Sequence, residues 1–384
     1  MGSGASYPTT QFVHPFSNEM YTPFGASRMD SEKLNSDNTL QQYNVNLIDT
    51  PFAGIWSVKV PDSIAPRPRS GHFTYYDEPN HTVYIGYGSF NSQLFNDLWA
   101  FDTLNDTWRK IPLTGDEISC RSGTRASFYS NHLILFGGYC EPDYFGDLHT
   151  IDVNTGERRL LATNGIPPSP RSSPIVAVYK NKLFVWGGFN QEWPSELNIL
   201  DLDTLTWTNI DQLIHGRTAV PWVLDGNILY SFGGSKVGTM FCLDMETNEI
   251  TMKQTTGSAP TSSIMGAGMV RVEHYVFFFG GRSNNNQYTL VYACDLNKMW
   301  WFVFHIMPDG KTVSIQDGVI SQKSGRFMLP RIHSFSVCYI KEKREILSFL
   351  GYPENDPPQL NVINIAESMS FIHLREDMVS VLNY

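Results

Sequence analysis

LFVWGGFNQEWPSELNILDLDTLTWT, residues 183–208, contains two apolar runs joined by a polar and aromatic loop. The first run ends at Gly187 and Gly188, and the second ends at Asp201 and is followed by Trp207. Short apolar runs bounded by glycine and aspartate are typical of β-strands and tight turns. The stretch is either a single hairpin or one copy of a repeat, and a repeat would determine the fold.

The apolar run that ends in two glycines recurs along the chain. The second glycines of the copies are Gly88, Gly138, Gly188, Gly234, Gly281 and Gly351, so successive copies lie 50, 50, 46, 47 and 70 residues apart. A period near 50 residues indicates a repeat architecture. Tyr87 and Leu350 replace the first glycine in two copies, and we expect a strand to end there all the same.

The rest of the quoted stretch recurs as well. A loop follows the glycines, and a second apolar run then ends in Asp102, Asp152, Asp201, Asp244, Asp295 or Asn364. We expect these side chains to cap the hairpin turn that follows. An aromatic position such as Trp108 comes next, and another short strand, which follows a turn such as Arg69-Ser70-Gly71, precedes each pair of glycines. Four short strands in each copy predict an antiparallel all-β fold.

This pattern resembles the kelch repeat. The resemblance covers residues 51–371 and rests on the paired glycines, the spaced aromatic residue and the arginine-bearing turn, which recur together. It implies a β-propeller with four antiparallel strands in each blade around a central channel. We predict six blades, with seven as the alternative. The strand near Trp56, within residues 53–60, is expected to close the ring by pairing with strands between Arg331 and Ile365.

The two ends of the chain lack the repeat pattern. Residues 1–50 are rich in Ser, Thr, Asn and Gln, so we expect a disordered or loosely draped tail. Residues 372–384 are expected to form a short tail or a helix, because apolar residues in 374–382 have helical spacing. Such a helix would pack on the ring or lead into a further domain of a larger protein or complex. Met1-Gly2 fits an N-myristoylation motif or a plain Gly/Ser tail.

Composition limits the classes of partner and the location. The chain has 28 Lys and Arg against 38 Asp and Glu, a net charge of -10, which argues against a nucleic acid partner. An odd set of 5 cysteines without a CxxC pair predicts reduced thiols in the cytosol or nucleus, and we expect a cytoplasmic location. We expect neither a signal peptide nor a transmembrane segment.

Catalytic motifs are not found in the sequence. It contains no GxSxG turn, no phosphate-binding loop and no HExxH helix. Acidic residues and His149 gather in residues 141–149, but Asp147-Leu148 matches Asn96-Asp97-Leu98 at the start of a third strand, so we predict no metal and no cofactor. The alternative is an enzyme with a ring-centred metal site, such as a sugar oxidase or a lyase.

A partner-binding surface is expected at one end of the ring. The loop after the second strand and the connection between blades leave the same end of an antiparallel blade, and binding residues concentrate on such loops. The candidates are Arg69, Arg121, Arg171, Arg217, Arg331, Tyr139, Tyr144, Phe189, Trp193 and Arg282. An insertion at residues 305–329 is expected at the same end, because long loops in compact folds are usually functional or disordered.

Aromatic residues and arginines are the side chains that dominate binding hot spots. Arginine pairs with carboxylates and phosphates, so the expected ligand is a protein or an acidic or phosphorylated peptide. The alternative for each arginine is a hydrogen bond to a backbone carbonyl of the neighbouring blade. We expect a non-catalytic interaction module: a ubiquitin ligase adaptor, a cytoskeletal organiser or a signalling scaffold.

Overall fold

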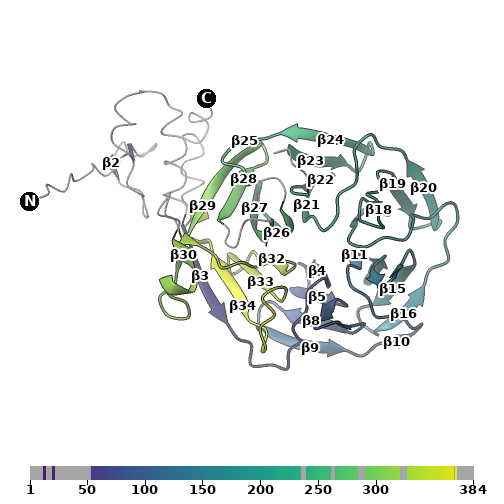
Figure 1. The fold of residues 1–384 in the computed structure, drawn as a ribbon, viewed down its shortest axis with the longest axis horizontal. Coiled ribbons are helices and arrows are strands. Elements are labelled where there is room, and N and C mark those ends of the chain that lie inside the picture. Colours follow the sequence, from purple (N-terminus) through teal and green to yellow (C-terminus); the bar gives the residue numbers. More distant parts are fainter. Residues whose placement is uncertain are drawn as a thin grey trace, which may run out of the picture.

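The computed structural model describes residues 12–13, 20–21, 53–234, 239–260, 264–283, 290–320, 327–366 and 368–369. Strands predominate in this part of the chain and are arranged around a ring (Figure 1). Its helical residues are the 3₁₀ turn η1 (Ile315–Asp317) and residues 366, 368 and 369. The all-β prediction is confirmed. No helix among the described residues is long and apolar enough to cross a membrane.

The predicted tails fall almost entirely outside the described residues. In the first 50 residues the structure describes only β1 (Phe12–Val13) and β2 (Met20–Tyr21), which pair antiparallel. The predicted C-terminal helix at 374–382 lies outside the described part.

Three of the sheets consist of four antiparallel strands in sequence order. They are β4 (Phe73–Asp77), β5 (Thr82–Gly86), β8 (Leu98–Asp102) and β9 (Thr107–Ile111); β17 (Ile175–Tyr179), β18 (Lys182–Trp186), β19 (Leu197–Asp201) and β20 (Thr206–Ile210); and β21 (Trp222–Asp225), β22 (Ile228–Ser231), β23 (Thr239–Asp244) and β24 (Glu249–Gln254). A further sheet contains β11 (Arg125–Tyr129), β12 (His132–Phe136), β15 (Leu148–Asp152) and β16 (Glu157–Leu160), with β10 (Thr114–Gly115) added in parallel. These sheets confirm blades of four antiparallel strands in a propeller-like arrangement.

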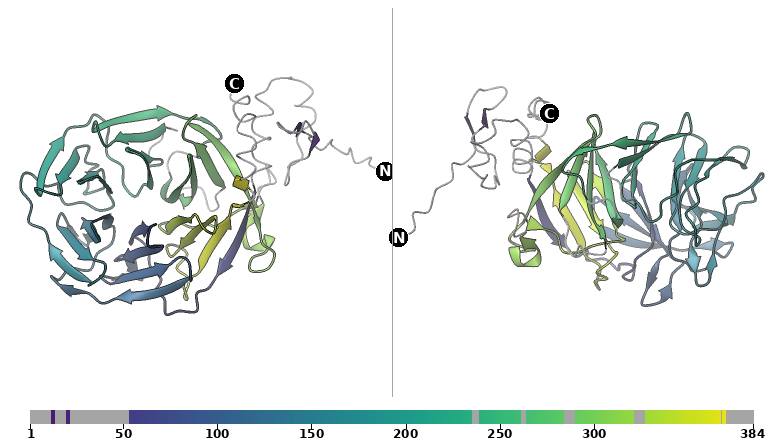
Figure 2. Two further views of the ribbon diagram at one scale, coloured as in Figure 1. Left: turned by 180° about the vertical axis from the view of Figure 1, so that it is seen from behind. Right: turned by 45° about the horizontal axis from the view of Figure 1, so that its top comes forward.

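The remaining large sheet has nine strands and contains both ends of the ring. One part comprises β26 (Met265–Val272), β27 (Tyr275–Arg282), β28 (Val291–Asp295) and β29 (Trp300–Pro308), with β25 (Thr256–Gly257) beside β29; the other comprises β3 (Ala53–Lys59), β34 (Leu360–Asn364), β33 (Glu345–Phe349) and β32 (Ser336–Ile340). Trp56 pairs with Ile363, so the predicted pairing of the first strand with the last repeat is confirmed. The parallel pairing of β3 with β29 was not predicted, and it joins the two parts (Figure 2).

Aromatic side chains fill the space between neighbouring sheets. Trp186 of β18 stacks on Phe241 of β23 with ring centroids 4.3 Å apart. Phe101 of β8 lies 5.5 Å from Phe349 of β33, so the first repeat packs against the last one. Such ring contacts add to the free energy that the buried apolar area contributes. A single four-stranded sheet could not bury both of its faces without these neighbours.

Backbone hydrogen bonds link successive repeats at the paired glycines. The second glycine of each copy donates its N–H to a carbonyl oxygen at the start of the next repeat: Gly88 to Arg121, Gly138 to Arg171, Gly188 to Arg217, Gly234 to Ile264, Gly281 to Ile332, and Gly351 to Arg69, over 2.7–3.1 Å. The last of these bonds runs from the final repeat back to the first. The links therefore continue around the whole ring.

The first glycine of each pair adopts a left-handed backbone conformation. At Gly187 φ is +68°, and a Cβ atom there would overlap the carbonyl oxygen of Arg217. Tyr87 and Leu350, which replace this glycine, have φ values of 63° and 59°, and the preceding strands end at Gly86 and Phe349. The expectation that strands end at these two substitutions is confirmed.

Candidate interaction surface

The loops after the second strands meet the connections between repeats at one end of the ring. Antiparallel bridges join the two sets of loops: Ser70 with Ser89, Ser122 with Tyr139, Ser172 with Phe189, and His333 with Tyr352. The geometry confirms that these loops leave the ring on the same side. The acidic residues at the ends of the third strands cap the opposite hairpins as expected; Asp201, for example, accepts hydrogen bonds from the backbone N–H groups of Asp203 and Thr204.

Four of the candidate arginines are buried at the base of these loops. Arg69 and Arg171 are 0% exposed, Arg121 is 2% exposed and Arg217 is 5% exposed. Each donates a hydrogen bond from Nη1 to the carbonyl oxygen at the end of the second strand in its own repeat: Tyr87 at 3.1 Å, Gly137 at 3.4 Å, Gly187 at 3.1 Å and Gly233 at 3.0 Å. Buried and bonded in this way, these groups anchor the loops, and their direct contact with a partner stays a prediction. The carbonyl alternative is observed, although within the repeat rather than across to its neighbour.

Acidic side chains pair with three of these arginines. Asp97 and Asp147 each accept two hydrogen bonds, from Arg69 and Arg121 respectively, and Glu196 accepts one from Arg171. The sequence analysis treated these acids only as the starts of third strands and missed their pairing. Their separations from the arginines, 28, 26 and 25 residues, were the signal that could have identified the pairs.

The surroundings of Asp147 keep its carboxyl group ionised. Burial alone would raise the pKa of Asp147, but hydrogen bonds from His149 and Arg121 lower it below the usual value. The guanidinium group of Arg121 also stacks over the Phe145 ring at 3.6 Å. The cluster at residues 141–149 thus forms one support beneath a loop. In the part of the chain that the structure describes, no three His, Cys, Asp or Glu side chains gather as a metal site would need.

Arg331 and Arg282 lie apart from the buried arginines. The bridge from His333 to Tyr352 places Ile332, not Arg331, at the position that Arg69 occupies in the first repeat, so the grouping of Arg331 with the other arginines was wrong by one residue. Arg282 is exposed and Arg331 is partly exposed. Burial first, and then the charges of Arg282 and Arg331, lower the pKa of His333 to about 4. The two arginines therefore form a basic area beside His333.

Four aromatic candidates form one continuous cluster. The ring of Tyr139, in β13 (Tyr139–Cys140), lies 4.8 Å from that of Tyr144, in β14 (Asp143–Tyr144). Tyr144 lies 6.3 Å from Phe189, and Phe189 lies 5.4 Å from Trp193. Trp193 is 55% exposed. The cluster connects the loops of two adjacent repeats and ends in a large exposed ring.

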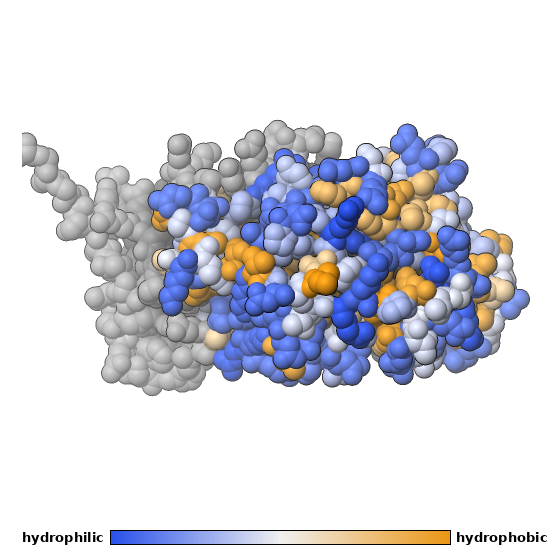
Figure 3. Space-filling model, turned by 90° about the horizontal axis from the view of Figure 1, so that it is seen from below, coloured by the Kyte–Doolittle hydropathy of each residue, from blue (hydrophilic) through white to orange (hydrophobic). Residues whose placement is uncertain are grey.

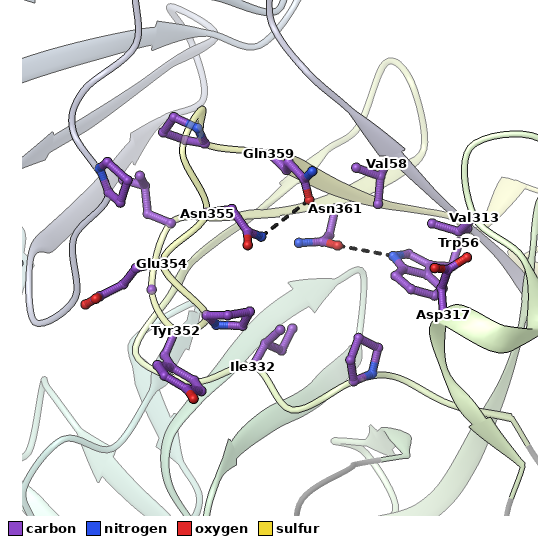
Figure 4. Close-up of a pocket in the computed structure, with 16 residues that line it drawn as sticks. Trp56, Val58, Val313, Asp317, Ile332, Tyr352, Glu354, Asn355, Gln359 and Asn361 are labelled. Carbon is purple, nitrogen blue, oxygen red and sulfur yellow. Dashed lines mark hydrogen bonds between the residues drawn. The ribbon is translucent and has the colours of Figure 1, made fainter.

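A hollow of about 200 Å³ lies at the insertion (Figure 4). Trp56 of β3, Asp317 of η1 and the segment from Leu350 to Asn361 line it. The segment includes Tyr352, whose bridge to His333 belongs to the loop end of the ring, so the predicted placement of the insertion at this end agrees with the structure. The hollow was not predicted from the sequence, because its walls come from three distant parts of the chain.

The ring of four-stranded antiparallel blades, linked at paired glycines, defines a kelch-type β-propeller. The family profile described as the KLHDC2/KLHL20/DRC7 Kelch-repeats domain matches residues 17–234, more than half of the sequence, and the chain belongs to the kelch-repeat family. Propellers of this family typically serve protein interaction.

Proteins of other organisms are similar to the chain over part of their length. Acyl-CoA-binding domain-containing proteins 5 and 4 of Arabidopsis thaliana are 26% identical over 311 residues and 25% identical over 344 residues, which cover 75% and 83% of this chain. Kelch domain-containing protein 10 of Rattus norvegicus is 25% identical over 273 residues, covering 63% of this chain and 66% of that protein. The chain spans about half the length of the Arabidopsis relatives, 45% and 49%.

Proposed function

We propose that the chain is a non-catalytic protein-interaction module with six blades. The links between repeats number six, and the nine-stranded sheet divides at the β29–β3 pairing into two blades of four strands with β25 at the side. The ring comprises residues 51–371, with residues 1–50 and 372–384 as tails. Its role is that of an adaptor or scaffold, including the ubiquitin ligase adaptors.

The observation that supports this function is the exposure of Trp193 on a firmly held loop. Its ring contacts Phe189, and the carbonyl oxygen of Ser195 accepts a hydrogen bond from the indole of the buried Trp186 at 3.1 Å. Exposed tryptophan is costly to leave in water and is enriched in binding hot spots. A loop that is already ordered loses little conformational freedom when a partner binds.

The partner is proposed to be a protein that covers the aromatic cluster of Tyr139, Tyr144, Phe189 and Trp193. An acidic or phosphorylated segment of it would meet Arg282 and Arg331, the candidate arginines that are not buried. In the side view of Figure 3, hydrophobic groups are separated by hydrophilic residues, which favours the loop end over that side. We further propose a cytoplasmic location, supported by five free cysteines.

The test is a Trp193→Ala variant. Affinity capture with the full chain identifies a bound protein, and its Kd is then measured for both forms. We expect binding to weaken by about 30-fold, or about 2 kcal/mol, as for other hot-spot aromatics. The free energy of unfolding should change by less than about 0.5 kcal/mol. Leu104→Ala, at an exposed position in the hairpin between β8 and β9 at the other end of the ring, is the matched control.

The proposal fails if Trp193→Ala and Leu104→Ala bind the captured protein equally well, or if Trp193→Ala unfolds the chain. Metal analysis of the purified protein tests the catalytic alternative, since stoichiometric copper or iron would contradict a non-catalytic module.

A further inference from the structure

The hollow beside the insertion has the dimensions of a site for one side chain. Its volume of about 200 Å³ is smaller than the roughly 300–1,000 Å³ that small-molecule sites occupy. Four prolines line it, Pro68, Pro330, Pro353 and Pro358. Because proline has a fixed φ and no backbone N–H, these walls are stiff and offer no backbone donor at those positions.

The polar side-chain groups around the hollow include carboxylates, side-chain amides and the Tyr352 hydroxyl. Asp317 and Glu354 lie at its two ends, with Asn355, Gln359 and Asn361 between them (Figure 4). Among the described residues, its lining includes no Lys, Arg or His. Within the described part of the chain, neither carboxylate has an ion-pair partner. The hollow therefore has a negative charge that the described residues do not neutralise.

Asp317 is held rigidly in the turn that forms one wall. Its Oδ2 atom accepts hydrogen bonds from the backbone N–H of Ser314 at 2.6 Å and from the Ser314 hydroxyl at 2.8 Å. The backbone bond, followed by the hydroxyl bond, lowers the pKa of Asp317 below its usual value. Asp309 fixes the preceding residues by accepting the N–H groups of Lys311, Thr312 and Val313. The carboxylate is thus ionised at neutral pH and has a defined position.

An apolar floor lies next to this carboxylate. Trp56, Val313 and Ile332 are 3%, 7% and 9% exposed and all line the hollow. The Trp56 indole N–H is directed to Oδ1 of Asn361 at 3.3 Å. Asp317 and Trp56 both line the hollow, and Figure 4 shows them toward the same end of it. A long basic side chain matches this combination, because its methylene stem packs on apolar surface while its charged head reaches a carboxylate.

We propose that this hollow binds a lysine or arginine side chain of a partner protein, with the stem over Trp56 and the charged group at Asp317. The proposal rests on the interaction function above and adds a second contact area with the opposite charge preference to that of Arg282 and Arg331. Glu354, at the other end, attracts the neighbouring part of a basic segment. An acidic or phosphorylated segment is disfavoured here, since like charges at an interface are repulsive.

The first experiment uses hexa-arginine, hexaglutamate and an uncharged Gly-Ser peptide of equal length as probes for the full chain. Binding is measured by fluorescence anisotropy at about 0.15 M ionic strength, where exposed charges are screened beyond roughly 8 Å. The Asp317→Asn, Glu354→Gln double variant removes both carboxylates and keeps their shapes. The Glu78→Gln, Glu249→Gln double variant removes the same charge from exposed hairpin positions at the other end of the ring.

We expect hexa-arginine to bind the wild-type chain and to lose about ten-fold in affinity with the first double variant, because charge-assisted hydrogen bonds are lost. The second double variant should change the affinity by less than about two-fold. The indole N–H resonance of Trp56, assigned with Trp56→Phe, should shift on titration of the wild-type chain. Equal affinities of hexa-arginine for the two double variants, or an unmoved Trp56 resonance, would each overturn the proposal.

Trp193→Ala separates this proposal from the interaction function. This variant should leave the affinity for hexa-arginine unchanged and should weaken the binding of the captured protein. If the captured protein depends on Trp193 but binds the Asp317→Asn, Glu354→Gln variant normally, the hollow is not a contact for it and the further inference fails while the interaction function stands. If the captured protein binds Trp193→Ala as tightly as the wild-type chain, the proposed interaction surface is wrong, and this holds for any result with hexa-arginine.

Discussion

The backbone N–H of Gly351 donates a 2.8 Å hydrogen bond to the carbonyl oxygen of Arg69, which lies at the start of the first repeat. The same bond joins every earlier pair of neighbouring repeats, so the junction between the two ends of the ring has the geometry of an ordinary junction. The last repeat differs from the others in that its fourth strand, β3, comes from the start of the chain and pairs with β34 on one side and β29 of the preceding repeat on the other. The stability of the ring therefore depends on this strand.

Loss of the Trp56 side chain should destabilise the ring strongly. Trp56 is 3% exposed, and its ring lies 5.8 Å from that of Phe327. Trp56→Ala is expected to lower the free energy of unfolding by about 3–5 kcal/mol, as for other buried aromatic truncations. Ile55→Ala, at a 41% exposed position in the same strand, should cost less than about 1 kcal/mol. Urea unfolding measures both, and similar losses would show that β3 does not close the ring through its buried face.

Alanine at the first glycine of a pair should be poorly tolerated. Gly187→Ala both places a side chain at φ +68° and drives its Cβ into the carbonyl of Arg217. We expect a loss of at least about 3 kcal/mol, because a backbone shift adds to the cost of roughly 1–2 kcal/mol for the left-handed conformation.

Gly226→Ala is the matched control for that variant. Gly226 has a φ of +60°, but a Cβ there meets no atom within 4 Å. It should lose only about 1–2 kcal/mol. Thermal unfolding measures the loss of stability in both variants. Equal losses would mean that the close approach of Gly187 to Arg217 has no energetic effect.

Removal of a buried guanidinium group should cost more than removal of an exposed one. Arg171→Met leaves the carbonyl oxygens of Ser169 and Gly187 and the carboxylate of Glu196 without their partner. The expected loss is about 2–4 kcal/mol, since buried acceptors that lose a charged donor become costly. Arg67→Met, at an exposed position whose side chain donates a hydrogen bond to Gln93, should change stability by less than about 0.5 kcal/mol. A stable Arg171→Met protein in denaturant titration would contradict the anchoring role.

Acid should destabilise the ring through His72. Burial, followed by the charges of Arg69 and Arg125, lowers the pKa of His72 to about 3, and its Nε2 lies 2.6 Å from the Ser336 hydroxyl. Between these two pKa values the unfolded chain, whose histidine pKa is near 6.5, binds a proton at His72 and the folded chain does not. The contribution of neutral His72 to the free energy of unfolding is therefore complete above about pH 6.5 and is lost progressively as the pH falls toward 3.

His72→Gln tests this pH dependence. The free energy of unfolding of the wild-type chain should fall between pH 7 and 5 by about 2 kcal/mol more than that of the variant. The comparison of slopes removes the cost of the substitution itself. Parallel pH profiles would contradict the prediction, because they would show that His72 takes up its proton at the same pH in the folded and the unfolded chain.

Repeated features of the fold were predictable because each copy of the sequence carries the same local signals. Gly187-Gly188 and Asp201 predict a strand end and a capped turn in one copy, and the same residue types do so in the others. The replacement of the first glycine by Tyr87 did not change the predicted strand end, since the apolar run before Tyr87 ends at the same position as in the other copies. Local turn chemistry and strand patterning therefore accounted for the blades.

Contacts between separate parts of the chain were harder to predict. Arg331 looked equivalent to Arg69 because both lie in an arginine-bearing turn before a strand, but the N–H of Gly281 bonds to the carbonyl of Ile332. Three of the buried arginines pair with an acid more than 20 residues away, as Arg121 does with Asp147. The β29–β3 pairing has no local signature, because it depends on how the ring closes in space.

The position of β3 also determines the order in which the ring can be completed. Trp56 and its hydrogen-bond partner Asn361 are 305 residues apart in sequence, and contacts of such long separation form slowly. During synthesis, β3 precedes both of its partner strands, and an unpaired strand can template pairing with another chain. Two nascent copies that exchange β3 would each have a complete ring, with the first strand of each supplied by the other. Exchange of this kind is the characteristic misassembly of repeat proteins, and here it would begin at the N-terminal strand.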